Sequence, residues 1–67
     1  MSVAKVIEIV ASSTESWDDA FKQGLARANK TLKGVTGAEL LSQKVKLEDG
    51  KIKEFRVHIK ITFILEG

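Results

Sequence analysis

The chain has 67 residues, enough for one small domain covering residues 1–67 and too few for two. It has no cysteine and one histidine, which excludes disulfides, cysteine nucleophiles, and thiolate or multi-histidine metal sites within one chain. The net charge of +2, from 11 basic and 9 acidic residues, is too even to indicate nucleic acid. A core this small, without a covalent crosslink, makes association with further copies the expected source of stability.

The N-terminal half predicts a strand followed by a helix. Residues 3–11 are rich in Val and Ile, and beyond Lys5 they alternate between an apolar face and a mixed one. Residues 14–33 are expected to be helical, with Ser12 or Ser13 as the N-cap. The apolar stripe of this helix is expected to pack in the core, and it consists of Trp17, Ala20, Phe21, Leu25, Ala28 and Leu32.

The next segment predicts the end of the helix and a second strand. Gly34 is the expected C′ residue, and residues 35–37 are expected to be a short connector. Residues 38–48 have the composition of a strand. Three of its apolar residues are expected to share one face: Leu41, Val45 and Leu47.

The C-terminal segment predicts a hairpin and a long final strand. Asp49-Gly50 is a strong signal for a two-residue turn, because both turn positions need positive φ. The strand over residues 52–66 should alternate, with Ile64 as the one apolar residue on its polar face. Its apolar face contains Phe55, Val57, Ile59, Ile61, Phe63 and Leu65. Its polar face contains Arg56, His58, Lys60, Thr62 and Glu66.

The order β-α-β-β predicts an α+β fold. The helix returns the chain so that the second strand runs parallel to the first, and the final strand then runs antiparallel to both. A three-stranded antiparallel sheet of order 1-3-2, packed by one face on the helix, satisfies these directions. The first and second strands would then be open edges, which favour pairing with neighbouring copies.

This arrangement resembles the dodecins, small β-α-β-β proteins that assemble as hollow shells of twelve subunits and commonly bind flavins. The resemblance covers nearly the whole chain and rests on the order and spacing of short segments. These are residues 5–10, Ser12-Ser13, Trp17, residues 26–28 with Thr31-Leu32, residues 38–40, and the ending 57–63.

Two positions depart from the flavin-binding pattern that the resemblance implies. The family's flavin-stacking tryptophan precedes an Ala-Glu-aliphatic run, and Gly37 occupies that position here. A family glutamine that hydrogen-bonds the flavin ring corresponds to Arg56, whose guanidinium donates but does not accept. Gly37 and Arg56 are thus the candidate cofactor-binding positions, both in altered form.

Further charged residues allow other sites. Arg56 and Lys60 could form a ring of cations around a symmetry axis and hold a phosphate, although a hydrated polar face with counterions is the favoured interpretation. Glu39 and Glu48, clustered across subunits, could bind a divalent ion such as calcium. His58 is expected to be a solvated residue, since the sequence places no acid beside it.

The expected function is therefore binding and storage in a homododecameric shell, not catalysis. The resemblance implies riboflavin, FMN or FAD as the ligand, and the alternative is a structural or calcium-binding shell without flavin. No catalytic constellation, signal peptide or membrane span is indicated, so a cytoplasmic protein without nucleic-acid or membrane partners is expected.

Overall fold

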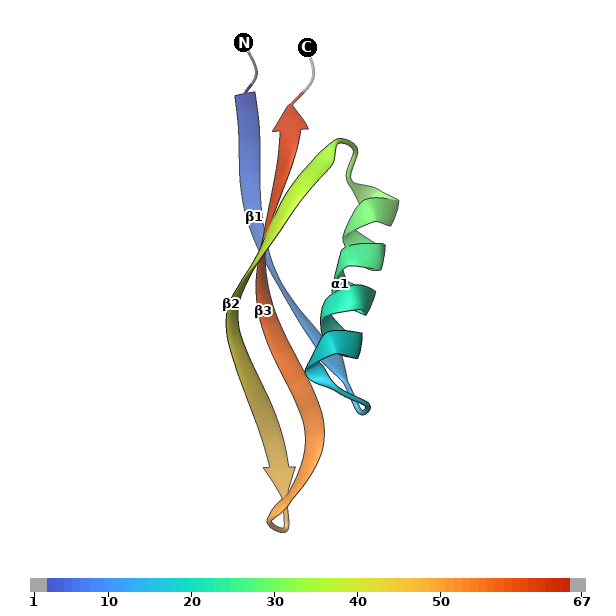
Figure 1. Ribbon diagram of the computed structural model, residues 1–67, viewed down its shortest axis with the longest axis vertical. Coiled ribbons are helices and arrows are strands. Elements are labelled where there is room, and N and C mark those ends of the chain that lie inside the picture. Colours follow the sequence, from blue (N-terminus) through green and yellow to red (C-terminus); the bar gives the residue numbers. More distant parts are fainter. Residues whose placement is uncertain (1–2, 66–67) are drawn as a thin grey trace.

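The computed structural model describes residues 3–65, which form one helix and one three-stranded sheet (Figure 1). Strand β1 (Val3–Ser13) leads to helix α1 (Trp17–Thr31), and the hairpin of β2 (Val35–Glu48) and β3 (Lys51–Leu65) follows. The sheet order is β1-β3-β2 and both pairings are antiparallel. The predicted α+β fold and its strand order are confirmed, while Glu66 lies outside the described residues.

The central strand β3 provides the core. Val57, Ile59 and Ile61 are at most 1% exposed, because their face of the sheet is covered by α1. From the helix, Ala20 and Ala28 complete the buried cluster. The remaining residues of the predicted stripe pack against this cluster: Trp17, Phe21, Leu25 and Leu32. The predicted alternation of β3 and the predicted helix face are therefore confirmed.

The start of the helix differs from the prediction. Ser16 is the N-cap, and its Oγ accepts a hydrogen bond from the Asp19 backbone N–H at 2.9 Å. Ser12 and Ser13 are wrong as caps because β1 continues to Ser13, which pairs with Phe55 and holds the backbone extended. The Ser13 hydroxyl instead donates to Asp19 Oδ2 at 2.6 Å and so ties the end of β1 to the first helical turn.

The link from α1 to β2 is also shorter than predicted. The helix ends at Thr31, two residues earlier than predicted, with Leu32 as the C-cap. Gly34 is therefore not the C′ residue; it lies two residues after the cap, with the left-handed φ of 73° that favours glycine. The Gly34 carbonyl accepts from the Ile64 backbone N–H at 2.9 Å, so this turn is tied to β3. Residues 35–37 were predicted as a connector and instead begin β2, with Val35 opposite Phe63.

The hairpin turn is as predicted, with φ values of 52° at Asp49 and 77° at Gly50. Three irregularities interrupt the pairing of β2 with β3, and one of them is the extra residue Thr36 near the start of β2. Lys53 is an extra residue on β3, and Leu41 is an extra residue on β2. The prediction that Leu41, Val45 and Leu47 share a face is wrong for this reason: Leu41 lies in a bulge, and Leu40 takes the place opposite Ile59.

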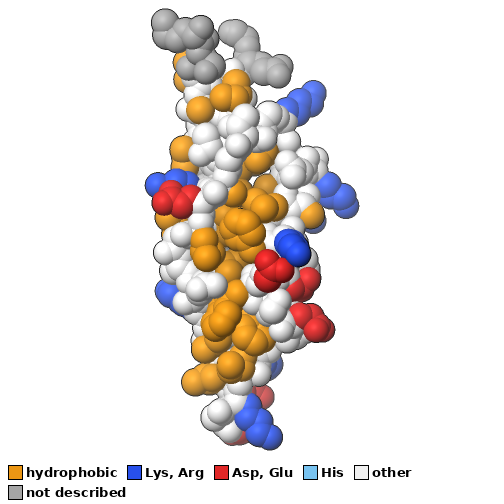
Figure 2. Space-filling view, in the orientation of Figure 1, with side chains coloured by type: hydrophobic (Ala, Val, Ile, Leu, Met, Phe, Trp, Pro, Cys, Tyr) orange, Lys and Arg blue, Asp and Glu red, His pale blue; other side chains and the backbone are white. Residues whose placement is uncertain are grey.

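The molecule is long and thin, 51 × 19 × 13 Å, and the β2–β3 hairpin extends past the N-terminal end of α1 (Figure 1). Apolar side chains form a band along the face that carries β2 and one flank of α1 (Figure 2). The large hydrophobic residues that are exposed are Val3, Val6, Val10, Leu40, Leu41, Val45, Leu47, Ile52 and Leu65. Over residues 3–65, no helix has the length and apolar character needed to span a membrane.

Gly24 is buried where α1 crosses the sheet, and the sequence pattern did not single it out. A Cβ at this position would lie 3.0 Å from Ile59 Cδ1 and 3.1 Å from Ala11 Cβ.

We predict that Gly24→Ala lowers the free energy of unfolding by roughly 0.5–2 kcal/mol, because overpacking outweighs the gain in helix propensity. Asn29→Ala, at an exposed position of the same helix, should instead raise it. Thermal unfolding of both variants at one protein concentration checks this, and a stabilised Gly24→Ala would contradict it.

Candidate functional site

The sheet face opposite α1 carries most of the polar and charged side chains of the strands. Because β3 alternates, its residues 56, 58 and 60 point away from the core that 57, 59 and 61 form. The pairings with β1 and β2 extend these three residues into cross-strand rows. The rows are Ser12–Arg56–Lys44, Val10–His58–Ser42 and Glu8–Lys60–Glu39.

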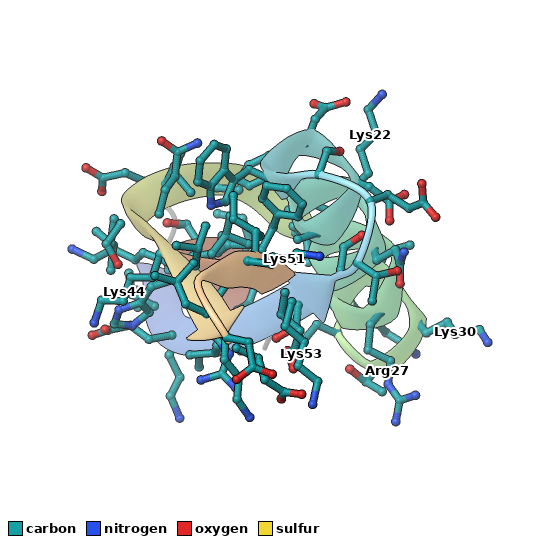
Figure 3. The ribbon with its side chains drawn as sticks, turned by 90° about the horizontal axis from the view of Figure 1, so that it is seen from below. Lys22, Arg27, Lys30, Lys44, Lys51 and Lys53 are labelled. Atoms are coloured by element: carbon teal, nitrogen blue, oxygen red, sulfur yellow. The ribbon has the colours of Figure 1, made fainter. Side chains whose placement is uncertain are left out.

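A shallow depression of about 200 Å³ lies over the first two rows. Lys44, Arg56 and His58 contribute its basic groups, and Val10 contributes an exposed apolar wall. Lys44 lies directly opposite Arg56 in the β2–β3 pairing. Seen from the hairpin end, Lys44 lies on the other side of the molecule from the helix residues Lys22 and Lys30 (Figure 3).

Two carboxylates flank these basic groups without neutralising all of them. Glu54 Oε1 lies 3.6 Å from Arg56 Nε, and both side chains are partly exposed. Glu8 Oε1 lies 2.7 Å from His58 Nε2, across the β1–β3 pairing. The expectation that His58 has no acid beside it is therefore wrong, because the strand register supplies Glu8 from the other end of the chain.

Trp17 fixes the part of β2 that carries Lys44. Its Nε1 donates to the Lys44 backbone carbonyl at 3.0 Å, and its ring meets Phe55 edge to face, with centroids 5.1 Å apart. The predicted packing role of Trp17 is confirmed by its contact with the core cluster. The indole is also the polar link that joins the start of α1 to β2.

Gly37 and Arg56, the two predicted cofactor positions, do not come together in one chain. Gly37 is opposite Thr62, six residues along β3 from Arg56, which corresponds to about 20 Å. A Cβ at Gly37 would meet the Thr62 Cβ at 3.9 Å, an ordinary contact, so the position has room for a side chain. It offers no ring on which a flavin could stack. A site that uses both positions would therefore combine residues 37 and 56 of different copies, and Arg56 would bring to it a guanidinium that donates hydrogen bonds.

The carboxylates considered for a divalent ion are engaged with lysines. Glu39 Oε1 lies 4.0 Å from Lys60 Nζ, and Glu48 Oε2 lies 2.8 Å from Lys53 Nζ. Within residues 3–65, no three acidic or histidine side chains gather in a way that could hold a metal ion.

The fold and the polar sheet face define a small α+β protein with open sheet edges and a basic depression. The dodecin family model matches residues 3–66, and the chain belongs to the dodecin family. It is 33% identical to the dodecin of Thermus thermophilus over 64 residues, which cover 96% of this chain and 93% of that protein. It is 27% identical to the calcium dodecin of Mycobacterium tuberculosis over 63 residues, 94% of this chain and 89% of that protein.

Solved structures agree with this assignment. The dodecin of Streptomyces davaonensis superposes with a TM-score of 0.92 and 32% identity, over 98% of this chain and 97% of that one. The calcium dodecin of M. tuberculosis, described as having a novel calcium-binding site, superposes with a TM-score of 0.85 and 29% identity, over 97% of this chain and 93% of that one. The relatives thus include a protein named for calcium.

Sequence reasoning paired Arg56 with Lys60 and did not place Lys44 opposite Arg56. A hairpin with a two-residue turn and no bulge places residue 44 opposite residue 55. The extra residue Lys53 shifts the register by one and brings Lys44 opposite Arg56. Nothing in the local sequence marks that bulge, so the signal is visible only in three dimensions.

The Trp17 hydrogen bond gives a test of how the site is held. We predict that Trp17→Phe costs about 1–2 kcal/mol of unfolding free energy, because the Lys44 carbonyl loses its donor while an aromatic ring is kept. Phe55→Leu is the matched variant, since it removes the ring contact and keeps the hydrogen bond. Denaturant unfolding of the two variants at equal protein concentration measures how much the hydrogen bond and the ring contact each contribute to the free energy of unfolding. An unchanged stability of Trp17→Phe would show that the indole nitrogen does not hold β2.

Proposed function

We propose that this chain assembles into a closed shell of twelve copies that stores a small anionic organic molecule between subunits. The observation that carries the proposal is the amount of apolar surface that one copy leaves exposed beside two open sheet edges. Val10 and Leu47 are 67% and 58% exposed, and nine large hydrophobic residues among 3–65 are exposed in total. Such edges and patches favour association with identical copies.

The proposed role is binding, because the polar sheet face offers a basic depression. Flavin nucleotides such as FMN and FAD are the first ligands to consider, because the family resemblance implies a flavin. Gly37 has no ring on which a flavin could stack, so contact with the flavin ring should be weak. Arg56 and Lys44 are cations that could contact an anionic group. Riboflavin, which lacks the phosphate, should then bind more weakly than FMN.

The second candidate is a calcium-binding shell, and similarity to the calcium dodecin of M. tuberculosis favours it. Calcium prefers several oxygen ligands. Glu39 and Glu48 from neighbouring copies would have to converge, and each would exchange a lysine partner for the ion.

One set of measurements separates the two candidates. The purified protein is titrated with riboflavin, FMN and calcium, with flavin fluorescence and calorimetry as readouts. Quenching of FMN supports the storage of flavin nucleotides, and calcium uptake after dialysis against a chelator supports the ion-binding shell. An assembled protein that binds neither would contradict both.

The first prediction of this function concerns assembly. Twelve copies of a 7.4 kDa chain give a particle of about 89 kDa with closed symmetry. Light scattering or native mass spectrometry at micromolar concentration measures the mass directly. A stable monomer or dimer would contradict the shell, because the chain would then remain folded in solution without covering its exposed apolar residues in a larger assembly.

The second prediction concerns Gly37. Gly37→Trp should raise flavin affinity by roughly five- to a hundredfold, since stacking and burial of an aromatic contribute on the order of 1–3 kcal/mol. The backbone at Gly37 is not left-handed and the nearest neighbour of a Cβ is 3.9 Å away, so a side chain is tolerated there. Fluorescence quenching of riboflavin and FMN provides the measurement.

Gly37→Ala is the matched control for this substitution, because it adds a Cβ without a ring and should leave flavin affinity unchanged. For riboflavin, which has no phosphate for Arg56 to bind, Arg56→Gln restores an acceptor and should help more in combination with Gly37→Trp than alone, since residues 37 and 56 of neighbouring copies would act on one ligand. A correctly assembled double variant that does not quench flavin would mean that the subunit interfaces serve another ligand.

A further inference from the structure

The basic residues are unevenly distributed along the chain, although their excess over the acidic residues is small. Between Asp19 and Glu39 the sequence contains four cations and no acidic residue. One of them, Lys22, forms an ion pair with Asp18 at 3.1 Å. The other three are exposed, and none forms an ion pair with a residue in the range 3–65. These helix-end cations lie on the second half of α1 and just after it: Arg27, Lys30 and Lys33.

Stabilisation of the helix explains only part of this cluster. Cations favour the negative end of the helix dipole, but the effect falls off within the last turn. Lys30 is the basic residue of that turn, whereas Arg27 precedes it and Lys33 follows the C-cap Leu32. Residues three apart are neighbours on a helix surface, so the like charges of Arg27 and Lys30 are unfavourable for α1 itself.

A further cation reaches the same end of the molecule from the start of the chain. Lys5 and Val35 lie opposite Phe63, one from each neighbouring strand. This row is on the helix side of the sheet, because Phe63 is two residues along β3 from the buried Ile61. Val35 is only two residues after Lys33, so the exposed Lys5 adds positive charge to the end of the molecule where α1 finishes.

The outer side of α1 should stay accessible when copies associate. Every exposed large hydrophobic residue in the range 3–65 belongs to a strand, and α1 contributes none. Contacts that cover apolar surface would therefore form through the strands and leave this side of the helix in solvent. Arg27 and Lys30 both project from α1 away from the sheet, and Lys22 lies apart from them (Figure 3).

We propose that the helix-end cations bind the phosphate backbone of a nucleic acid, without preference for its sequence. Lys and Arg side chains supply such binding because each phosphate that they neutralise releases its counterions. A membrane surface fits less well, because a helix that binds a bilayer inserts large apolar side chains and α1 exposes none. The even total charge of the chain conceals this patch, since the acidic residues lie elsewhere in the sequence.

Repetition would make the binding effective. Three cations of one copy give weak attraction, whereas twelve copies in the proposed shell present the same cluster many times. A linear polyanion can then contact several copies at once, which raises its overall affinity without any new contact within a copy. The inference rests on the proposed shell for this affinity, and it is independent of the stored ligand.

Binding of the whole protein to a fluorescent DNA duplex of mixed sequence, measured by anisotropy, tests the proposal. Three phosphate contacts correspond to a slope of about −2.7 in log affinity against log salt. Affinity should therefore fall by roughly 40-fold or more between 50 and 200 mM salt, with the larger loss if several copies contact one duplex.

The double variant Arg27→Gln/Lys30→Gln should weaken DNA binding about tenfold or more at 100 mM salt and reduce the salt slope. Lys22→Gln/Lys53→Gln is the matched control, because it removes the same number of cations, each of which is paired with an acidic residue. The control should weaken binding much less. Glutamine has nearly the helix propensity of Lys and Arg, so both proteins should fold, and native mass spectrometry verifies their assembly.

The outcomes distinguish this site from general attraction and from the shell. Absence of DNA binding at 50 mM salt, or equal losses in the two double variants, would overturn the site. Binding to phosphatidylglycerol vesicles as tight as binding to DNA would overturn the nucleic acid as the partner. A monomeric protein that shows the predicted variant pattern would support the helix-end cations and reject the shell.

Discussion

Strand β3 hydrogen-bonds to both other strands and contributes the three large side chains that are fully buried, so the position of every other element depends on it. Its helix-facing side, with Val57, Ile59 and Ile61, fixes where α1 lies. The close approach of α1 is possible because the buried helix position facing Ile59 and Ala11 is Gly24. The opposite side of β3 is then free of core packing, and each of its polar residues is placed by the register with β1 and β2.

Two compensating register shifts connect this scaffold to the candidate site. The extra residue Lys53 moves β2 by one position relative to β3, and the extra residue Leu41 moves it back. Between them, side chains of β2 lie on the faces opposite to those of a regular hairpin. Gln43 is opposite Val57 on the helix side, while Lys44 is opposite Arg56 on the polar side. The basic depression is thus a consequence of bulges and not of a local sequence motif.

The parts of the structure that the sequence predicted are those set by periodicity and by turn chemistry. The alternation of β3, the apolar stripe of α1 and the Asp49-Gly50 turn each follow from residues adjacent in the chain, and they suffice for the strand order. The helix start was not predicted because it depends on how far the pairing of β1 with β3 continues. The Lys44–Arg56 pair was not predicted because it depends on where the register of β2 with β3 shifts. Gly37 and Arg56 were identified by resemblance alone, and the structure places them about 20 Å apart within one chain.

A chain this small has little stability to spare, which makes its unfavourable features informative. Exposed large apolar residues and a like-charge pair both lower the stability of an isolated copy. Partner copies that cover the apolar band would remove the first cost, because association stabilises the folded state by mass action. The exposed apolar residues that weaken the single copy are therefore also the surface through which further copies would stabilise it.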